Sequence, residues 1–194
     1  MFLLAHAGIA LGAAVVASGV FGSRSGHDPA GAALWRLPEE WLTSLGCRID
    51  LRVFLAGALL PDILDKPLGR IFYGTFGCRL FGHSLLFLLI IVLAGLGLYL
   101  RRRQPALLVL GLGVLSHLIL DGMVLDPRTL LWPVLGLTFP TVAAGDWEQA
   151  MMDQLLASPG TYLTELAGAA VLAWFTWLLA RRGRLLDFAR HGRT

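Results

Sequence analysis

Two residues that can bind a metal ion stand four positions apart in an otherwise apolar stretch. Residues 115–123 read LSHLILDGM, so His117 and Asp121 are separated by about one helical turn. Positions i and i+4 of a helix lie on the same face. An imidazole and a carboxylate on one face could present two ligands to a metal ion, and taken alone they could equally be a hydrogen-bonded pair at a helix end.

Four more residues of the same kind lie in or beside apolar segments, and three of them have an ordinary alternative role. Asp62 follows Pro61 and could form a turn, the pair His83 and Ser84 could cap a helix, and His6 could reach toward a membrane interface. Together, three imidazoles and three carboxylates form a ligand set suited to zinc, and also to manganese or iron. The metal ligands predicted on this basis are His6, Asp62, Asp65, His83, His117 and Asp121.

The composition indicates a membrane protein. Of the 194 residues, 56% are hydrophobic and only 15% are charged, and the mean hydropathy is +0.70, which is far more apolar than a soluble domain. Two cysteines do not form a disulfide framework. The net charge of +3 is small and unevenly placed, so it relates to membrane topology, and no nucleic-acid partner is expected.

The hydropathy pattern predicts an all-α protein, a polytopic membrane bundle of about five helices that forms one domain over residues 1–194. Four apolar segments are long enough to span a bilayer core, which requires ~20 residues, and a fifth is shorter. The first segment lacks the basic start of a signal peptide and contains His6, so we expect it to remain as a helix. The expected helices lie near residues 2–21, 52–64, 83–100, 105–125 and 162–180.

The arginines predict the orientation of these helices. The runs at 101–103 and 181–184 flank apolar segments, and the positive-inside rule places both in the cytoplasm of a bacterial inner membrane. If 52–64 also crosses, only four of the 16 lysines and arginines fall on the outer side. All six predicted ligands then lie at one depth on the periplasmic face, and ionisable groups at membrane depth indicate function.

The segments that carry these residues resemble a bacterial inner-membrane family described as LexA-regulated, YdjM-type metal-dependent hydrolases. The resemblance covers roughly the first 135 residues and is carried by AHAGIALG around His6, GALLPDILDKP at 57–67, GCRLFGHSLLF at 77–87, LSHLILDGM at 115–123 and LLWP at 130–133. The family is similar in motif pattern to zinc-dependent phospholipases C and P1-type single-strand nucleases. That similarity implies a phosphoester substrate.

The chain departs from the family pattern at three positions. The family usually reads PDIDH where this chain has PDILD, so Leu64 replaces a carboxylate and Asp65 replaces a histidine. It usually reads GHRGFTHS where this chain has GCRLFGHS, so Cys78 replaces a histidine. A thiolate can bind zinc, but Cys78 could equally be an ordinary small buried residue. The departures put the second or third metal of a cluster in doubt.

The residue types also suggest catalytic roles. A bound metal would lower the pKa of water to about 7, with Asp62 as bridging ligand or general base and Asp121 as ligand or support for its neighbouring imidazole. Arg79 and Lys66 could receive a phosphate, although Lys66 is more easily explained as an exposed charge. Trp132 could line the pocket or lie in an interfacial belt, and the loop 126–161 is long enough to cover the site. His27 and His191 lie in polar segments and have no predicted role.

The depth of the expected site predicts the kind of substrate. Lipids reach a cluster at headgroup level sideways, so we expect hydrolysis of a phosphoester in a membrane lipid or a lipid-linked molecule. The main alternative is a metal-ion or proton transporter that uses the same histidines and aspartates, although such sites tend to lie near the midplane between repeats. A metal-stabilised scaffold is a third interpretation. The sequence leaves the oligomeric state open.

Overall fold

The computed structural model describes residues 3–22, 50–74, 79–139 and 159–192, and the ordered elements of these residues are all helical. This confirms the predicted all-α class. Five of the described helices are 15 residues or longer. The elements are α1 (Leu3–Gly22), α3 (Leu51–Tyr73), η3 (Phe81–His83), α4 (Leu85–Arg102), α5 (Ala106–Leu120), η4 (Met123–Leu125), α6 (Pro127–Leu130), α8 (Pro159–Arg181) and α9 (Leu185–His191).

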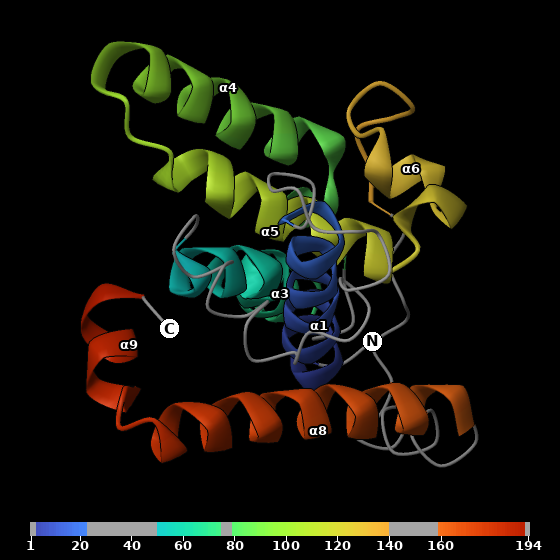
Figure 1. Ribbon diagram of the computed structural model, residues 1–194. Coiled ribbons are helices and arrows are strands. Elements are labelled where there is room, and N and C mark those ends of the chain that lie inside the picture. Colours follow the sequence, from blue (N-terminus) through green and yellow to red (C-terminus); the bar gives the residue numbers. More distant parts are fainter. Residues whose placement is uncertain (1–2, 23–49, 75–78, 140–158, 193–194) are drawn as a thin grey trace.

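The long helices pack in succession through the molecule (Figure 1). Helices α4 and α5 form a hairpin at the top of the view, α8 runs along the bottom, and α1 and α3 lie between them. Helix α3 packs mainly on α5, and α1 contacts α8, α3 and α5. The start of α1, the middle of α3, the segment before α4 and the end of α5 therefore come together inside the bundle.

Helix α3 differs from the expected short segment 52–64. It runs for 23 residues, from Leu51 to Tyr73, and contains Pro61 and Pro67 in its interior. The expected segment ended where the apolar run gives way to Asp65 and Lys66, and proline usually ends or kinks a helix. The packing of one face of α3 against α5 and η3 keeps the helix continuous. As a result, Asp62 and Asp65 lie in the interior of the helix and not at its end, where the sequence had placed them.

Two pairs of glycines allow helices to approach at backbone distance. A Cβ added to Gly113 of α5 would lie 2.7 Å from the backbone nitrogen of Ala58 in α3, and one added to Gly57 would overlap the Leu110 carbonyl oxygen. Gly8 of α1 and Gly168 of α8 face each other in the same way. Small residues permit this close packing of membrane helices.

Glycines also mediate the packing of α4 against α5, but not every glycine of α4 takes part. A Cβ on Gly95 would lie 3.0 Å from the Leu108 nitrogen, and one on Gly111 would lie 3.1 Å from Val92. In contrast, Gly97 faces open space. Gly95, Gly111 and Gly113 therefore lie at close helix contacts, and Gly97 does not.

The helix directions separate the polar cluster from the arginines. Helix α4 follows His83 and ends at Arg101 and Arg102, and α5 returns so that His117 lies in its last turn. Helix α8 runs in the same sense as α1, because Gly8 lies beside Gly168 and Gly12 beside Val171, and it ends at Arg181. The arginine-rich ends of α4 and α8 are thus opposite to the ends that adjoin the cluster.

The outer helix faces are apolar. Leu89, Ile90, Leu93 and Leu100 of α4 are each about half exposed or more. Two helices, over Leu85–Arg102 and Tyr162–Arg181, are long and apolar enough to cross a membrane, and Leu4–Val16 and Ala106–Leu120 are shorter apolar helices. Exposed aliphatic faces of this extent suit contact with lipid.

Polar side chains cap the N-termini of two helices, α4 beside the site and α3 at the opposite end. The Ser84 hydroxyl accepts a hydrogen bond from the Phe87 amide, so α4 begins directly after His83. Asp50 caps α3 by accepting the Arg52 amide, and the hydrogen bond from the Arg52 guanidinium lowers the pKa of Asp50. Arg52 also donates to the Ala189 carbonyl and ties α9 to the start of α3.

Candidate metal centre

His117 is held in one orientation by the backbone of α3. Its ring is completely buried, and Nδ1 lies 2.7 Å from the carbonyl oxygen of Ala58. A carbonyl only accepts hydrogen bonds, so Nδ1 carries the proton. The close approach of Gly113 to α3 brings the two helices near enough for this bond. In the neutral ring, the lone pair of Nε2 is then available on the other side.

His83 is held in the same way by a carboxylate. Its Nδ1 lies 2.7 Å from Oδ2 of Asp65, and both side chains are buried. An ionised carboxylate only accepts, so Nδ1 of His83 donates and Nε2 is left with its lone pair. Histidines that bind metals usually donate their second ring N–H to a carboxylate or a backbone carbonyl. Both histidines show this arrangement.

The two available nitrogens face each other. Nε2 of His117 lies 3.2 Å from Nε2 of His83. Two imidazole nitrogens bound to one tetrahedral zinc ion, each at a bond length of about 2.0–2.1 Å, stand roughly 3.3–3.4 Å apart. The observed separation therefore fits two ligands of one metal ion.

Two carboxylates complete the surroundings of these nitrogens. Nε2 of His83 lies 3.6 Å from Oδ2 of Asp121 and 3.7 Å from Oδ1 of Asp62. The ligand atoms of Asp62, His83 and His117 all lie within 4.8 Å of one another, so these three could hold a metal ion. Two nitrogens and two carboxylate oxygens form a set that zinc, manganese and iron accept.

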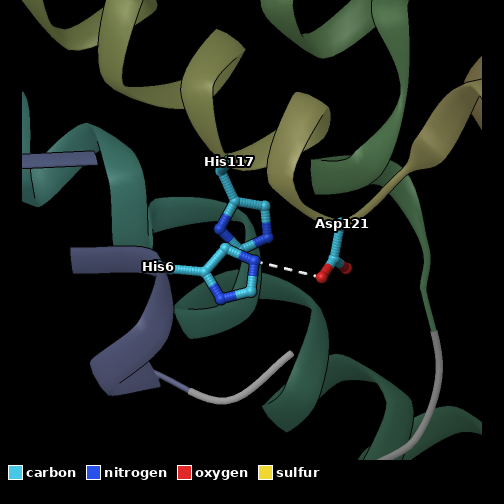
Figure 2. Close-up of side chains that lie close together, drawn as sticks. All are labelled: His6, His117 and Asp121. Atoms are coloured by element: carbon cyan, nitrogen blue, oxygen red, sulfur yellow. Dashed lines mark ion pairs between the residues drawn. The ribbon is translucent and has the colours of Figure 1, made fainter. Parts of the chain in front are cut away.

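His6 joins the cluster from α1 (Figure 2). Its ring stacks on His117 with centroids 4.1 Å apart, and Nε2 lies 3.0 Å from Oδ1 of Asp121. His6, His117 and Asp121 form a second group whose ligand atoms lie within 4.8 Å of one another. Both groups contain His117, whose Nε2 has a single lone pair, so the two groups are overlapping sites for one metal ion.

The structure places Asp65 behind His83 and away from the facing nitrogens. Its Oδ2 accepts hydrogen bonds from the Leu80 amide at 2.7 Å, the His83 amide at 3.2 Å and His83 Nδ1, and its Oδ1 accepts the Gly82 amide at 2.8 Å. Asp65 contacts the cluster through His83. The sequence predicted it as a ligand because its carboxylate adjoins an apolar segment at the same expected membrane depth as the other five residues.

Two cations contact the carboxylates where the cluster approaches the surface. Lys66 Nζ lies 2.8 Å from Oδ2 of Asp62, and Arg79 Nη2 lies 3.1 Å from Oδ2 of Asp121. The side chains are 33% and 41% exposed, whereas their carboxylate partners are at most 8% exposed. Lys66 is thus not a free surface charge, and both cations lie on the more exposed side of the carboxylates that they contact.

The sequence did not indicate a role for Glu165 of α8. The Ala5 amide, in the first turn of α1, lies 3.3 Å from each of its carboxylate oxygens. The first amides of a helix have no partner within the helix, and Glu165 supplies one beside His6. Glu165 is the only acidic residue of the segment 162–180, and an isolated carboxylate in an apolar helix could have indicated a buried polar contact.

Removing this carboxylate should loosen the start of α1. We expect Glu165→Ala to lower stability by about 0.5–2 kcal/mol, the range for losing a helix-capping acceptor, and to lower metal content by displacing His6. Glu165→Gln keeps an acceptor oxygen and serves as the matched control. Thermal unfolding and metal content of both variants in detergent test this expectation. If Glu165→Ala behaves like wild type in both measurements, this contact has no role.

Trp132 packs against the segment that carries His83. Its ring contacts Phe81 edge-on with centroids 6.1 Å apart and stacks on Phe139 at 5.1 Å. Phe81 belongs to the same short helix as His83. Trp132 thus supports this helix from the outside. Cys78, His27 and most of the loop expected to cover the site, residues 140–158, lie outside the described residues.

The chain was compared with known proteins. The model of a family described as YdjM inner membrane protein matches residues 1–185. The chain belongs to this family. The YdjM match includes every residue of the cluster and continues beyond the roughly 135 residues that carry the resemblance seen in the sequence. No curated protein and no solved structure matches.

Membership of the YdjM family agrees with the apolar helices. An inner membrane protein exposes aliphatic side chains to lipid, and two of the described helices are long enough to span a bilayer. The cluster of histidines and aspartates is therefore a polar, buried centre in a membrane protein. Burial of so many ionisable groups is costly, and in membrane proteins such groups usually pair with one another and mark a functional site.

Proposed function

We propose that this YdjM-family protein is a membrane-embedded metal-dependent hydrolase that cleaves a phosphoester in a lipid or a lipid-linked substrate. The observation that carries the proposal is the pair of facing nitrogens, His83 Nε2 and His117 Nε2, with both Nδ1 atoms held by acceptors. Without a cation between them, two lone pairs at 3.2 Å repel. A divalent metal, zinc in the first place and manganese or iron as alternatives, satisfies both.

The chemistry follows from the residues around these nitrogens. A metal at this position would supply a Lewis acid that lowers the pKa of water to about 7. Asp62 presents Oδ1 to the cluster while Lys66 holds its Oδ2, so the carboxylate has a defined orientation for binding the metal or accepting a proton. Arg79, more exposed than the carboxylate it contacts, is placed to bind a phosphate with its planar guanidinium.

The position of the cluster supports a substrate that comes from the membrane. The cluster adjoins the ends of α4 and α8 that are opposite to their arginines. Under the positive-inside rule, a multi-pass arrangement of these helices puts the site on the periplasmic side near headgroup level. A phosphate headgroup would reach Arg79 and Lys66 there.

The core beyond the cluster favours a hydrolase over a transporter. An ion pathway needs polar groups that continue through the bundle. The described core toward the arginine-bearing ends is a cluster of apolar side chains formed by Leu11, Val15, Leu51, Phe175, Leu178 and Leu179. Within the described residues, the buried polar groups are therefore concentrated at one end.

The proposal is tested by hydrolysis assays on the purified protein in detergent. Zinc-loaded, manganese-loaded and chelator-treated samples are given vesicles that contain a polyprenyl phosphate diester or phosphatidylglycerol, and the release of water-soluble phosphate compounds is measured. We expect turnover only with metal. Asp62→Asn should lower turnover by at least about 100-fold, which is the lower end of the range for losing a general base.

Asp187→Asn is the matched control, because Asp187 is exposed on α9 and has no contact with the cluster. This variant should keep wild-type turnover. Equal turnover before and after chelation would show that the hydrolysis is not metal-dependent. Absence of turnover in metal-loaded wild-type protein on all phosphoesters would reject the hydrolase.

A further inference from the structure

We propose that Asp65 is a positioning residue that orients His83 for metal binding and is not itself a metal ligand. The inference rests on the metal centre of the proposed function, and it assigns a new role to a residue that sequence reasoning placed among the ligands. Its evidence is the set of donors around the Asp65 carboxylate.

The carboxylate of Asp65 is held by four hydrogen bonds from the turn that carries His83. An ionised carboxylate offers about four acceptor positions. Oδ2 accepts from the Leu80 amide, the His83 amide and His83 Nδ1, and Oδ1 accepts from the Gly82 amide. Asp65 is 0% exposed, so water does not compete for these positions. A metal ion at Oδ2 would have to displace a hydrogen bond, and Oδ1 lies against the turn, where it accepts the Gly82 amide.

Three backbone amides converge on this carboxylate from the short segment 80–83. Successive N–H groups of one segment that point to one place form an anion-binding hollow. A carboxylate in such a hollow fixes the segment to α3. The segment carries His83 at its end and follows Arg79 directly. Asp65 therefore orients the turn between the candidate phosphate-binding arginine and the candidate ligand.

Gly82 shows how closely the turn fits the carboxylate. A Cβ on Gly82 would lie 2.9 Å from Oδ1 of Asp65 and 3.1 Å from Cα of Pro61. Nothing larger than glycine fits without pushing the carboxylate or the turn aside. The hydrogen bond from His83 Nδ1 thus depends on a residue that has no side chain to offer a metal ion.

The hydrogen bond determines which nitrogen of His83 is available. With its proton on Nδ1, His83 turns the lone pair of Nε2 toward His117, Asp62 and Asp121. If the proton moved to Nε2, the same ring would present N–H to the cluster and could not bind a metal there. Carboxylates behind a ligating histidine act in this way, and their loss typically weakens metal binding by about 10–100-fold.

The first test reads the protonation pattern of His83 directly in metal-free protein. Long-range 15N NMR correlations of histidine-labelled protein in detergent distinguish a proton on Nδ1 from one on Nε2, and His83→Gln assigns the signal. We expect the proton on Nδ1 in wild type and a mixture or the Nε2 form in Asp65→Asn. Finding the Nε2 form in wild type would overturn the proposal, whether or not the protein binds metal.

The second test measures zinc affinity by competition with a chromophoric chelator. Asp65→Asn, whose amide N–H groups face the donors of the turn, should bind zinc about 10–100-fold more weakly. Gly82→Ala changes no side chain of the cluster, but its Cβ presses on Oδ1 of Asp65. It should therefore also weaken zinc binding. It provides the test if Asp65→Asn does not fold. Asp187→Asn is again the matched control.

The two tests separate this proposal from the proposed function. If wild-type protein binds no metal and still has the proton of His83 on Nδ1, the hydrolase fails and the role of Asp65 in orienting His83 stands. If both variants fold and bind zinc as tightly as wild type, Asp65 is not a positioning residue. A direct bond from Asp65 to the metal in X-ray absorption spectra, lost in Asp65→Asn, would make it a ligand and overturn the proposal.

Discussion

Replacement of His117 by alanine is expected to remove metal from the whole cluster. His117 belongs to both groups of residues that could hold an ion, together with Asp62 and His83 in one and with His6 and Asp121 in the other. Loss of a supporting residue alone costs about 10–100-fold in metal affinity, so loss of this shared ligand should exceed the upper end of that range. Elemental mass spectrometry of the protein purified without chelators measures the result.

A histidine outside the cluster gives the matched control. His191 lies at the end of α9 and is exposed, so His191→Ala should keep the metal content of wild type. Circular dichroism of both variants shows whether the helices are intact. If folded His117→Ala retains stoichiometric metal, the centre does not include His117, and the arrangement of facing nitrogens has another explanation.

Substitution of Gly113 is expected to separate α3 from α5 and thereby disturb the site without touching a ligand. A Cβ at Gly113 would lie 2.7 Å from the Ala58 nitrogen and 2.8 Å from the Gly57 Cα. These are backbone atoms of α3, and they cannot turn away as a side chain can. We expect Gly113→Ala to destabilise the protein by about 1–3 kcal/mol, as overpacking of a well-packed core does.

The same substitution should weaken metal binding, because Ala58 provides the carbonyl that holds His117. Thermal unfolding in detergent and zinc affinity measure the two effects. Gly97→Ala on α4 is the control: its Cβ meets nothing within 4 Å, and replacing glycine by alanine in a helix favours the folded state by up to about 1 kcal/mol. Equal stability of the two variants would show that the α3–α5 contact does not require glycine.

Much of the architecture could be predicted because membrane helices depend on local sequence properties. An apolar run of sufficient length becomes a helix, since lipid cannot satisfy exposed backbone groups. Four of the five expected helices accordingly lie within a few residues of α1, α4, α5 and α8. The helix 52–64 was too short because the apolar run ends there, before Asp65 and Lys66, whereas tertiary contacts keep α3 helical to Tyr73.

The residues of the candidate site could be predicted for a related reason. His and Asp side chains stand out in apolar helices, and alternating helix directions bring the ends that carry them to the same side. The structure places His6, Asp62, His83, His117 and Asp121 in one cluster. Whether these residues bind metal is the prediction that the variants above test.

The amino-acid sequence by itself determined the helical class, the apolar segments and the residue types available for a metal centre, because these depend on local composition and helical period. Only the tertiary structure decided which atoms face one another. The Nδ1 atoms of His83 and His117 are held by Asp65 and the Ala58 carbonyl, and the Ala5 amide by Glu165. These bonds join distant residues through the rotation and close approach of whole helices, which no local pattern encodes.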